Sequence, residues 1–125
     1  MGGCRIPAGE AGQGRDGAPK PYCAHYSQDE IRELVAYAQA RHIEIVPEID
    51  MPGHAQAAVA AYPKLGLMNP PPTVSADWGV HRVLFNVDEP TLRVLEDVLE
   101  EVTELFPARF VHIGGDEAVK DQWEQ

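Results

Sequence analysis

Arg109-Phe-Val-His-Ile-Gly-Gly-Asp-Glu117 is the stretch that decides the fold, because a short apolar run leads into two glycines and two adjacent carboxylates. The apolar run predicts a strand, in which successive side chains point to opposite faces. Asp116 and Glu117 therefore cannot converge on one ligand from inside a regular strand. Gly114 and Gly115 remove this restriction, since glycine adopts backbone angles closed to other residues. We expect the acids just past the strand end, where parallel α/β folds build ligand sites.

Two neighbouring acids have two interpretations. A proton-bearing and an ionised carboxyl group held together are typical of a glycosidase. Acidic residues are also favoured in the first turn of a helix, where they have no catalytic meaning. The preceding strand and glycine pair favour the functional interpretation, with Asp116 and Glu117 as candidate catalytic residues.

Composition narrows the class of protein. The chain has 125 residues, enough for one domain, and its 44% hydrophobic and 24% charged residues are typical of soluble globular proteins. Twenty acidic residues against ten Lys and Arg give a net charge of −10, which argues against nucleic acid or an anionic membrane as partner. No apolar run has the length of a membrane span, and the N-terminus lacks the apolar core of a signal peptide. We expect a soluble protein, and a neutral ligand remains open.

The two cysteines, Cys4 and Cys23, are too few to form a disulfide framework, although they could close one loop. They have no CxxC or HxxxH companion, so a zinc site is not expected. We predict two free thiols, no metal site and no cofactor.

Helices are predicted at three places. Residues 1–26 are rich in glycine and proline and predict a long loop. Ser27-Gln-Asp-Glu30 has the pattern of a capping box, and apolar residues follow it at helical spacing. A short alanine-rich helix is expected over 55–61, then an irregular connection over 62–81. A second long helix is expected to begin near Pro90 and to end before Pro107.

Two strands are predicted, Ile43–Val46 and Phe110–Ile113, each following a long helix. Strands that alternate with helices indicate an α/β fold with a parallel sheet and right-handed crossovers. Two buried parallel strands alone leave both edges open. We therefore infer that the chain is a piece of a larger domain.

A second polar cluster, Pro47-Glu-Ile-Asp-Met-Pro-Gly-His54, follows the first strand. If the two strands are parallel neighbours, Asp50 and His54 lie on the same rim as Asp116 and Glu117. His112 precedes the glycines, and a packing role is as consistent with its position as contact with substrate.

These clusters resemble a known family. Ile45-Val-Pro-Glu-Ile-Asp-Met-Pro-Gly-His-Ala55 and His112-Ile-Gly-Gly-Asp-Glu-Ala118 are similar to motifs of the family 20 glycoside hydrolases, the β-N-acetylhexosaminidases. The resemblance extends to Trp78-Gly79, to Lys120-Asp-Gln-Trp123 and to the opening Gly2-Gly-Cys-Arg-Ile-Pro7. It implies a partial (β/α)8 TIM barrel with about two of its eight strands. Residues 1–125 would be one fragment of that barrel: a loop over 1–26, then helix two through strand four and the following segment over 27–125.

The resemblance also implies a reaction. Such enzymes remove terminal non-reducing β-linked N-acetylglucosamine or N-acetylgalactosamine from oligosaccharides or glycoconjugates, with retention, using the substrate's acetamido oxygen as nucleophile. This substrate-assisted chemistry is an exception to the two-carboxylate rule. Glu117 matches the general acid/base and Asp116 the residue that orients the acetamido group.

The remaining residues have weaker assignments. His54 matches a histidine that helps set the acid's protonation together with an aspartate expected upstream of this chain. Asp50 is expected to support the turn that carries His54. Trp78 and Trp123 either stack on a sugar or pack locally.

Two other functions remain open. A metal-dependent hydrolase could use Asp50, His54, His112, Asp116 and Glu117 as ligands. The second possible function is that of a truncated barrel, which is catalytically inert or only binds sugar. Chelator sensitivity distinguishes the first, and the extent of the native polypeptide distinguishes the second.

Overall fold

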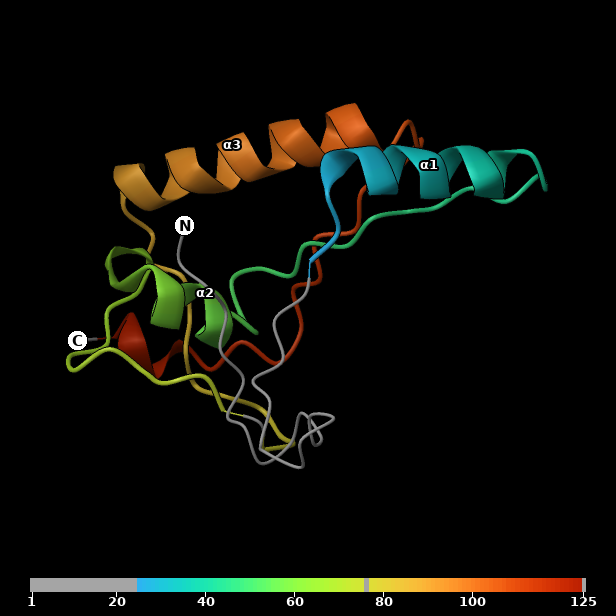
Figure 1. Cartoon of the computed structure of the whole chain (residues 1–125). Coiled ribbons are helices and arrows are strands. Elements are labelled where there is room, and N and C mark those ends of the chain that lie inside the picture. Colours follow the sequence, from blue (N-terminus) through green and yellow to red (C-terminus); the bar gives the residue numbers. More distant parts are fainter. Residues whose placement is uncertain (1–24, 76, 125) are drawn as a thin grey trace, which may run out of the picture.

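The structure is a computed structural model that describes residues 25–75 and 77–124. Its elements, in chain order, are α1 (Gln28–Gln39), α2 (Gln56–Ala61), the 3-10 turn η1 (Pro63–Leu65), α3 (Glu89–Leu105) and the 3-10 turn η2 (Lys120–Gln122) (Figure 1). Cys4, Cys23 and almost all of the predicted loop over 1–26 lie outside the described residues.

Helix α1 begins at the predicted capping box. The backbone N–H of Ser27 donates to Oε2 of Glu30 at 2.7 Å, and the N–H of Glu30 donates to the Ser27 hydroxyl at 3.2 Å. Val35 and Ala38 of this helix are buried. The helix predicted after Ser27 is confirmed.

Helix α3 also begins where the sequence predicts, with Pro90 in its first turn and Asp88 as N-cap. The Asp88 carboxylate accepts a hydrogen bond from the backbone N–H of Thr91 at 2.9 Å. The predicted apolar stripe is covered only in part, since Leu105 is buried whereas Leu92 and Val98 stay exposed.

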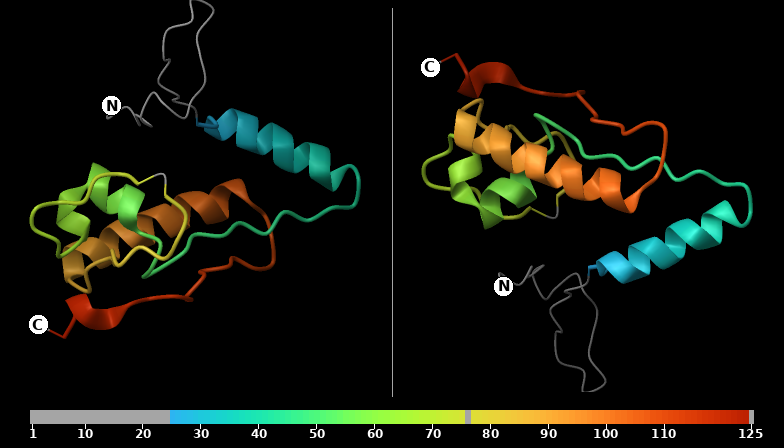
Figure 2. Two further views of the ribbon diagram at one scale, coloured as in Figure 1. Left: turned by 90° about the horizontal axis from the view of Figure 1, so that it is seen from below. Right: turned by 90° about the horizontal axis from the view of Figure 1, so that it is seen from above.

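Neither predicted strand is a strand among the described residues. Residues 43–46 and 110–113 are extended, and they lie beside a single parallel bridge that pairs Glu48 with His112. The two extended stretches run side by side beneath the long helices (Figures 1 and 2). Ile43 and Phe110 are 55% and 61% exposed, so the expectation of buried strands is wrong for these residues.

Pro47 explains where the pairing starts. His112 N–H donates to the Pro47 carbonyl at 2.9 Å, and Ile49 N–H donates to the His112 carbonyl at 3.0 Å. In this parallel register the preceding bond would run from an N–H at residue 47 to the Phe110 carbonyl. Proline has no N–H, so that bond is missing and pairing with residues 43–46 is weakened. The Glu44 side chain instead binds the Arg109 N–H at 2.9 Å.

The main core joins the predicted short helix to a stretch where the sequence analysis assigned no element. Val83, Leu84 and Phe85 are at most 8% exposed. Val83 and Phe85 pack with Ala55 and Val59, which belong to the turn and helix that follow His54. The core thus adjoins the segment that follows the polar cluster 47–54.

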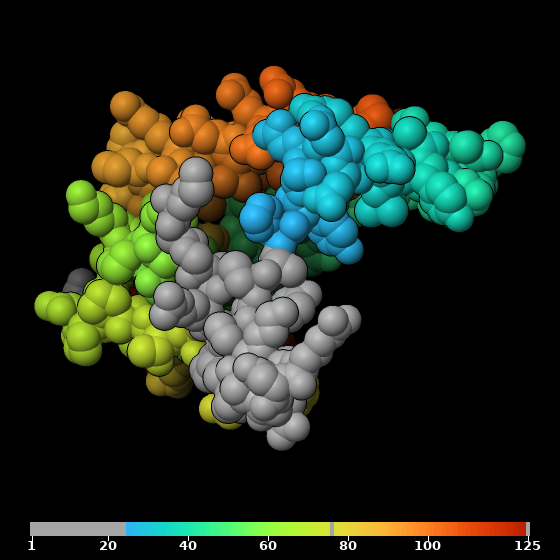
Figure 3. Space-filling view, in the orientation of Figure 1, coloured from blue at the N-terminus to red at the C-terminus, as the bar shows by residue number. Residues whose placement is uncertain are grey.

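Helix α1 projects from the body of the molecule, with much of its surface uncovered (Figure 3). Leu34 and Tyr37 on this helix are 47% and 59% exposed. Among the described residues, no helix is both long enough and apolar enough to cross a membrane.

The capping box predicts how α1 responds to acid. The Ser27 backbone N–H and then its hydroxyl hydrogen-bond to the Glu30 carboxylate, which lowers the pKa of Glu30 below its usual 4.5. A lowered folded-state pKa means that the stabilisation is present above the unfolded pKa and is lost as pH falls through the folded one. We expect Glu30→Gln to reduce the acid-dependent loss of helicity, measured by far-UV circular dichroism across an acid titration. Glu33→Gln, on the same helix but outside the box, is the matched control and should titrate like the parent.

Candidate active site

Three residues with positive φ shape the chain around the two acids. Gly114 and Gly115 have φ of +65° and +97°, and Glu117 has φ of +51°. The first two values are easy for glycine and costly for other residues. The expectation that the glycines turn the chain out of the extended conformation before the acids is confirmed.

The parallel pairing slips by one residue at this turn. A regular ladder would continue with Gly114 N–H donating to the Ile49 carbonyl and with Met51 N–H donating to the Gly114 carbonyl. Met51 N–H instead donates to the Ile113 carbonyl at 3.1 Å, and Gly114 N–H donates to Nδ1 of His112 at 3.1 Å. The slip ends the pairing and frees the backbone that carries the acids.

Asp50 occupies the space beside the glycine turn. Its Oδ1 accepts a hydrogen bond from Gly115 N–H at 3.2 Å. A Cβ atom at Gly114 would overlap the Asp50 carboxylate and would lie 3.0 Å from its Cα. Gly114 is therefore required both by its φ angle and by the close approach of Asp50.

His54 lies between the two polar clusters. It has φ of +51°, and its Nε2 lies 3.5 Å from Oε2 of Glu117 and 3.9 Å from Oδ2 of Asp50. Gly53 brings this turn close to the acids, because a Cβ there would lie 3.2 Å from the Asp116 carbonyl oxygen. Direct contact between the two turns places the imidazole beside the carboxylates.

Asp50, His54 and Asp116 each offer one ligand atom within a group whose atoms all lie within 4.8 Å of one another. Asp50 is half-buried, and the other two residues are exposed. The four residues Asp50, His54, Asp116 and Glu117 thus share one rim. Carboxylate and imidazole groups at this spacing are suited to proton exchange, and they are also ligand types for divalent metals.

His112 lies apart from that group of three. Its Nδ1 accepts the Gly114 N–H described above, and this hydrogen bond supports the glycine turn. Because Nδ1 then carries no proton, the Glu48 carboxylate 3.3 Å away is a neighbour and not a hydrogen-bond partner of that nitrogen.

The two tryptophans differ in their surroundings. Trp123 donates its indole N–H to the Phe85 carbonyl at 3.2 Å, so its side chain is engaged within the protein. Trp78 is fully exposed beside Gly79, which has φ of +143°.

Sequence reasoning missed three residues that organise this rim: Glu48, Phe85 and Gln122. Glu48 belongs to the polar cluster 47–54, but nothing in the sequence distinguished it from the other residues of that cluster. Phe85 belongs to the apolar run Val83-Leu-Phe85, which could have been read as a short buried segment. Gln122 lies in the stretch Lys120-Asp-Gln-Trp123 that shares the family resemblance, but nothing in the sequence indicated that its side-chain amide contacts residues about forty positions earlier in the chain.

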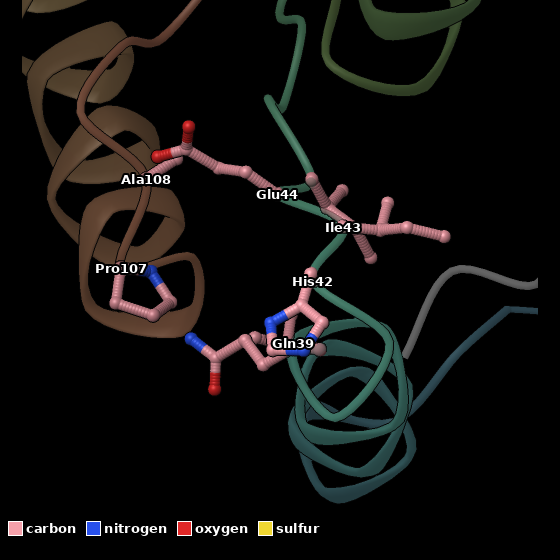
Figure 4. A pocket seen from close by; sticks show the side chains of 8 residues that line it. Gln39, His42, Ile43, Glu44, Pro107 and Ala108 are labelled. Atoms are coloured by element: carbon pink, nitrogen blue, oxygen red, sulfur yellow. The ribbon is translucent and has the colours of Figure 1, made fainter.

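A separate pocket of about 280 Å³ lies between the end of α1 and the chain after α3 (Figure 4). Its lining residues are Val35, Gln39, His42, Ile43, Glu44, Ile45, Pro107 and Ala108. These residues lie where the two extended stretches begin, whereas the acids lie where the stretches end. Ligand sites in parallel α/β folds lie at the carboxyl ends of strands, so this pocket is not the candidate site.

Comparison with known proteins defines the class. Residues 7–125 match the family model for the glycosyl hydrolase family 20 catalytic domain. The chain is 41% identical over 109 residues to a beta-hexosaminidase of Porphyromonas gingivalis, an alignment that covers 86% of this chain and 14% of that protein. It is 40% identical over 107 residues to a beta-hexosaminidase of Akkermansia muciniphila, covering 84% and 22%. The chain therefore belongs to glycosyl hydrolase family 20, and its aligned part spans between about a seventh and about a fifth of these relatives.

Solved structures agree with this assignment. A crystal structure of a beta-N-acetylhexosaminidase superimposes with a TM-score of 0.79 and 38% identity, over 90% of this chain and 24% of that one. The family 20 beta-N-acetylhexosaminidase from Streptomyces coelicolor gives a TM-score of 0.72 and 43% identity, over 82% and 20%. The course of the described chain is thus that of the corresponding part of these enzymes.

The two glycines predict different responses to substitution. Gly114→Ala should destabilise the chain by about 3 kcal/mol, because a strained φ angle adds to overlap with Asp50. Gly115→Ala is the control, because nothing lies within 4 Å of its added Cβ and only the backbone strain remains, about 1–2 kcal/mol. Urea unfolding of both variants measures the difference. Equal destabilisation would contradict the tight approach of Asp50.

Proposed function

We propose that this chain is part of the catalytic barrel of a β-N-acetylhexosaminidase, which hydrolyses terminal non-reducing β-linked N-acetylglucosamine or N-acetylgalactosamine. The observation that carries the proposal is the shared rim, where His54 Nε2 lies 3.5 Å from the Glu117 carboxylate beside Asp116. Family membership and the two motifs on this rim support it. One solved relative, a beta-hexosaminidase of Streptomyces plicatus, is in complex with its product GlcNAc.

Within that barrel we assign residues 27–125 to helix two through strand four and the following segment. The extended stretches that meet at Glu48 and His112 would be strands three and four. Their exposed apolar side chains, such as Ile43 and Phe110, are consistent with faces that further strands cover in a complete barrel.

The mechanism that we infer is retaining and substrate-assisted. The acetamido oxygen of the bound sugar attacks the anomeric carbon, while Glu117 donates a proton to the leaving glycosidic oxygen. Glu117 then takes a proton from the water that opens the resulting oxazolinium-like intermediate. Asp116 orients the acetamido N–H and stabilises the positive charge that develops on that group.

Asp50 and His54 would support these acids. The His54 imidazole lies within ion-pair distance of both Glu117 and Asp50. When the imidazole is protonated, it can hold the Glu117 carboxylate in position. Asp50 fixes the glycine turn through Gly115 N–H. For His112 we propose support of the same turn, with no contact to substrate.

A chimeric enzyme tests this function within the full length of a relative. In it, this chain replaces the matching stretch of the Porphyromonas gingivalis beta-hexosaminidase, of which the aligned region is 14%. We expect the chimera to release nitrophenol from p-nitrophenyl N-acetyl-β-glucosaminide. Glu117→Gln and Asp116→Asn should each lower the rate by about 100-fold or more, since each removes a proton-transfer or charge-stabilising group.

Two controls make the result specific. Glu124→Gln changes an exposed carboxylate that lies outside the candidate site and should leave the rate unchanged. A chelator should also have no effect, whereas loss of activity with chelator and recovery with a divalent ion would favour a metal-dependent hydrolase. A folded chimera without turnover would favour an inert fragment.

A further inference from the structure

The stretch 82–85 lies between the two turns that carry the candidate site. Phe85 N–H donates to the Pro52 carbonyl at 3.0 Å, two residues before His54. The Phe85 carbonyl accepts the indole N–H of Trp123 at 3.2 Å, six residues after Glu117. One buried residue therefore contacts both site-bearing segments through its backbone.

This stretch is a firm support. Val83, Leu84 and Phe85 are 3%, 1% and 8% exposed. Atoms in such a well-packed interior are displaced only at considerable cost. Groups hydrogen-bonded to this backbone are therefore held at defined positions.

Gln122 reinforces the contact made by Trp123. Its side-chain N–H donates to the Arg82 carbonyl, and its carbonyl oxygen accepts from Leu84 N–H at 3.5 Å. Asp121 adds an ion pair with Arg82 at 3.0 Å, but both side chains are exposed, and exposed pairs contribute little. We name the contacts of Gln122 and Trp123 with residues 82–85 the clasp. It is formed by η2 and the residue that follows it.

Few hydrogen bonds of the backbone hold the segment that carries the acids. Asp116, Glu117 and Ala118 make no backbone hydrogen bond to another backbone group of the described residues. Before them, Gly115 is bound to Asp50, and after them the clasp is the next attachment. Glu117 also has φ of +51°, a strained value that persists only when both sides of the turn are held.

We propose that Trp123 and Gln122 are positioning residues, whose clasp on residues 82–85 holds Glu117 within reach of His54. The catalytic consequence rests on the proposed function, whereas the structural consequence does not. Without the clasp, Glu117 is free to relax toward an ordinary negative φ and to swing its carboxyl group away from the imidazole.

Hydrogen–deuterium exchange on the full chain tests the structural consequence. The unmodified chain should protect the Leu84 amide, which donates to the Gln122 side chain. Trp123→Phe keeps an aromatic side chain but removes the indole N–H. It should speed exchange of the Gly114 and Gly115 amides, which precede the acids, by about fivefold, as expected for the loss of one hydrogen bond. Tyr62→Phe, which removes a hydroxyl from a 68% exposed aromatic side chain, should exchange like the parent.

Either of two exchange results would overturn the proposal. Fast exchange of the Leu84 amide in the unmodified chain would mean that the clasp does not exist in solution. Exchange of the Gly114 and Gly115 amides that is unchanged in Trp123→Phe would mean that the turn carrying the acids does not depend on the clasp. Both results are independent of catalysis.

Leaving-group dependence in the chimera tests the catalytic consequence. A poorly placed general acid slows departure of an alkoxide, which needs a proton, but not of dinitrophenolate, which leaves without one. We expect Trp123→Phe to lower kcat for N,N′-diacetylchitobiose by about 10- to 100-fold, with KM and the dinitrophenyl glycoside rate nearly unchanged. Equal loss on both substrates would indicate general damage and overturn positioning. An inactive unmodified chimera would instead contradict the proposed function, and the exchange result would still decide the clasp.

Discussion

One parallel contact between residues far apart in the sequence underlies the whole site. His112 binds the backbone on both sides of Glu48, and this pairing sets two extended stretches side by side with their carboxyl ends together. Because the polar residues of each stretch follow its end, pairing in this direction brings them onto one rim. An antiparallel arrangement of the same stretches would place them at opposite ends.

The parallel pairing must be short for the two acids to share one site. Pro47 weakens its extension backward, and the glycine turn prevents it from extending forward. Asp50 fills the space that a larger residue at Gly114 would need, and its carboxylate holds the turn in place. A longer regular ladder would direct Asp116 and Glu117 to opposite faces. The short pairing therefore lets two adjacent acids share a rim with His54.

The core is placed so that it supports the same rim from behind. Phe85 contacts the turn before His54 and the turn after Glu117, and Ala55 and Val59 pack against it. By contrast, the outer surface of α1 and the extended residues Ile43 and Phe110 are largely uncovered. The chain thus concentrates its packing around the site, whereas these other apolar surfaces remain exposed.

The sequence by itself determined the features that depend on neighbouring residues. The capping box at Ser27, the start of α3 near Pro90, the short helix after Ala55 and the glycine turn are set by interactions within a few residues, so local patterns predicted them. The motifs around His54 and Glu117 were also sufficient to indicate the family.

Only the tertiary structure decided which residues meet. The start of pairing at Pro47 rather than within Ile43–Val46, the burial of Val83–Phe85 and the attachment of Trp123 to Phe85 all join residues distant in sequence. Side-chain partners such as Glu48 with His112 depend on register, and a shift of one residue reverses every side chain. Register is set by the packing of the whole domain, which is why local patterns located the acids but did not reveal what holds them.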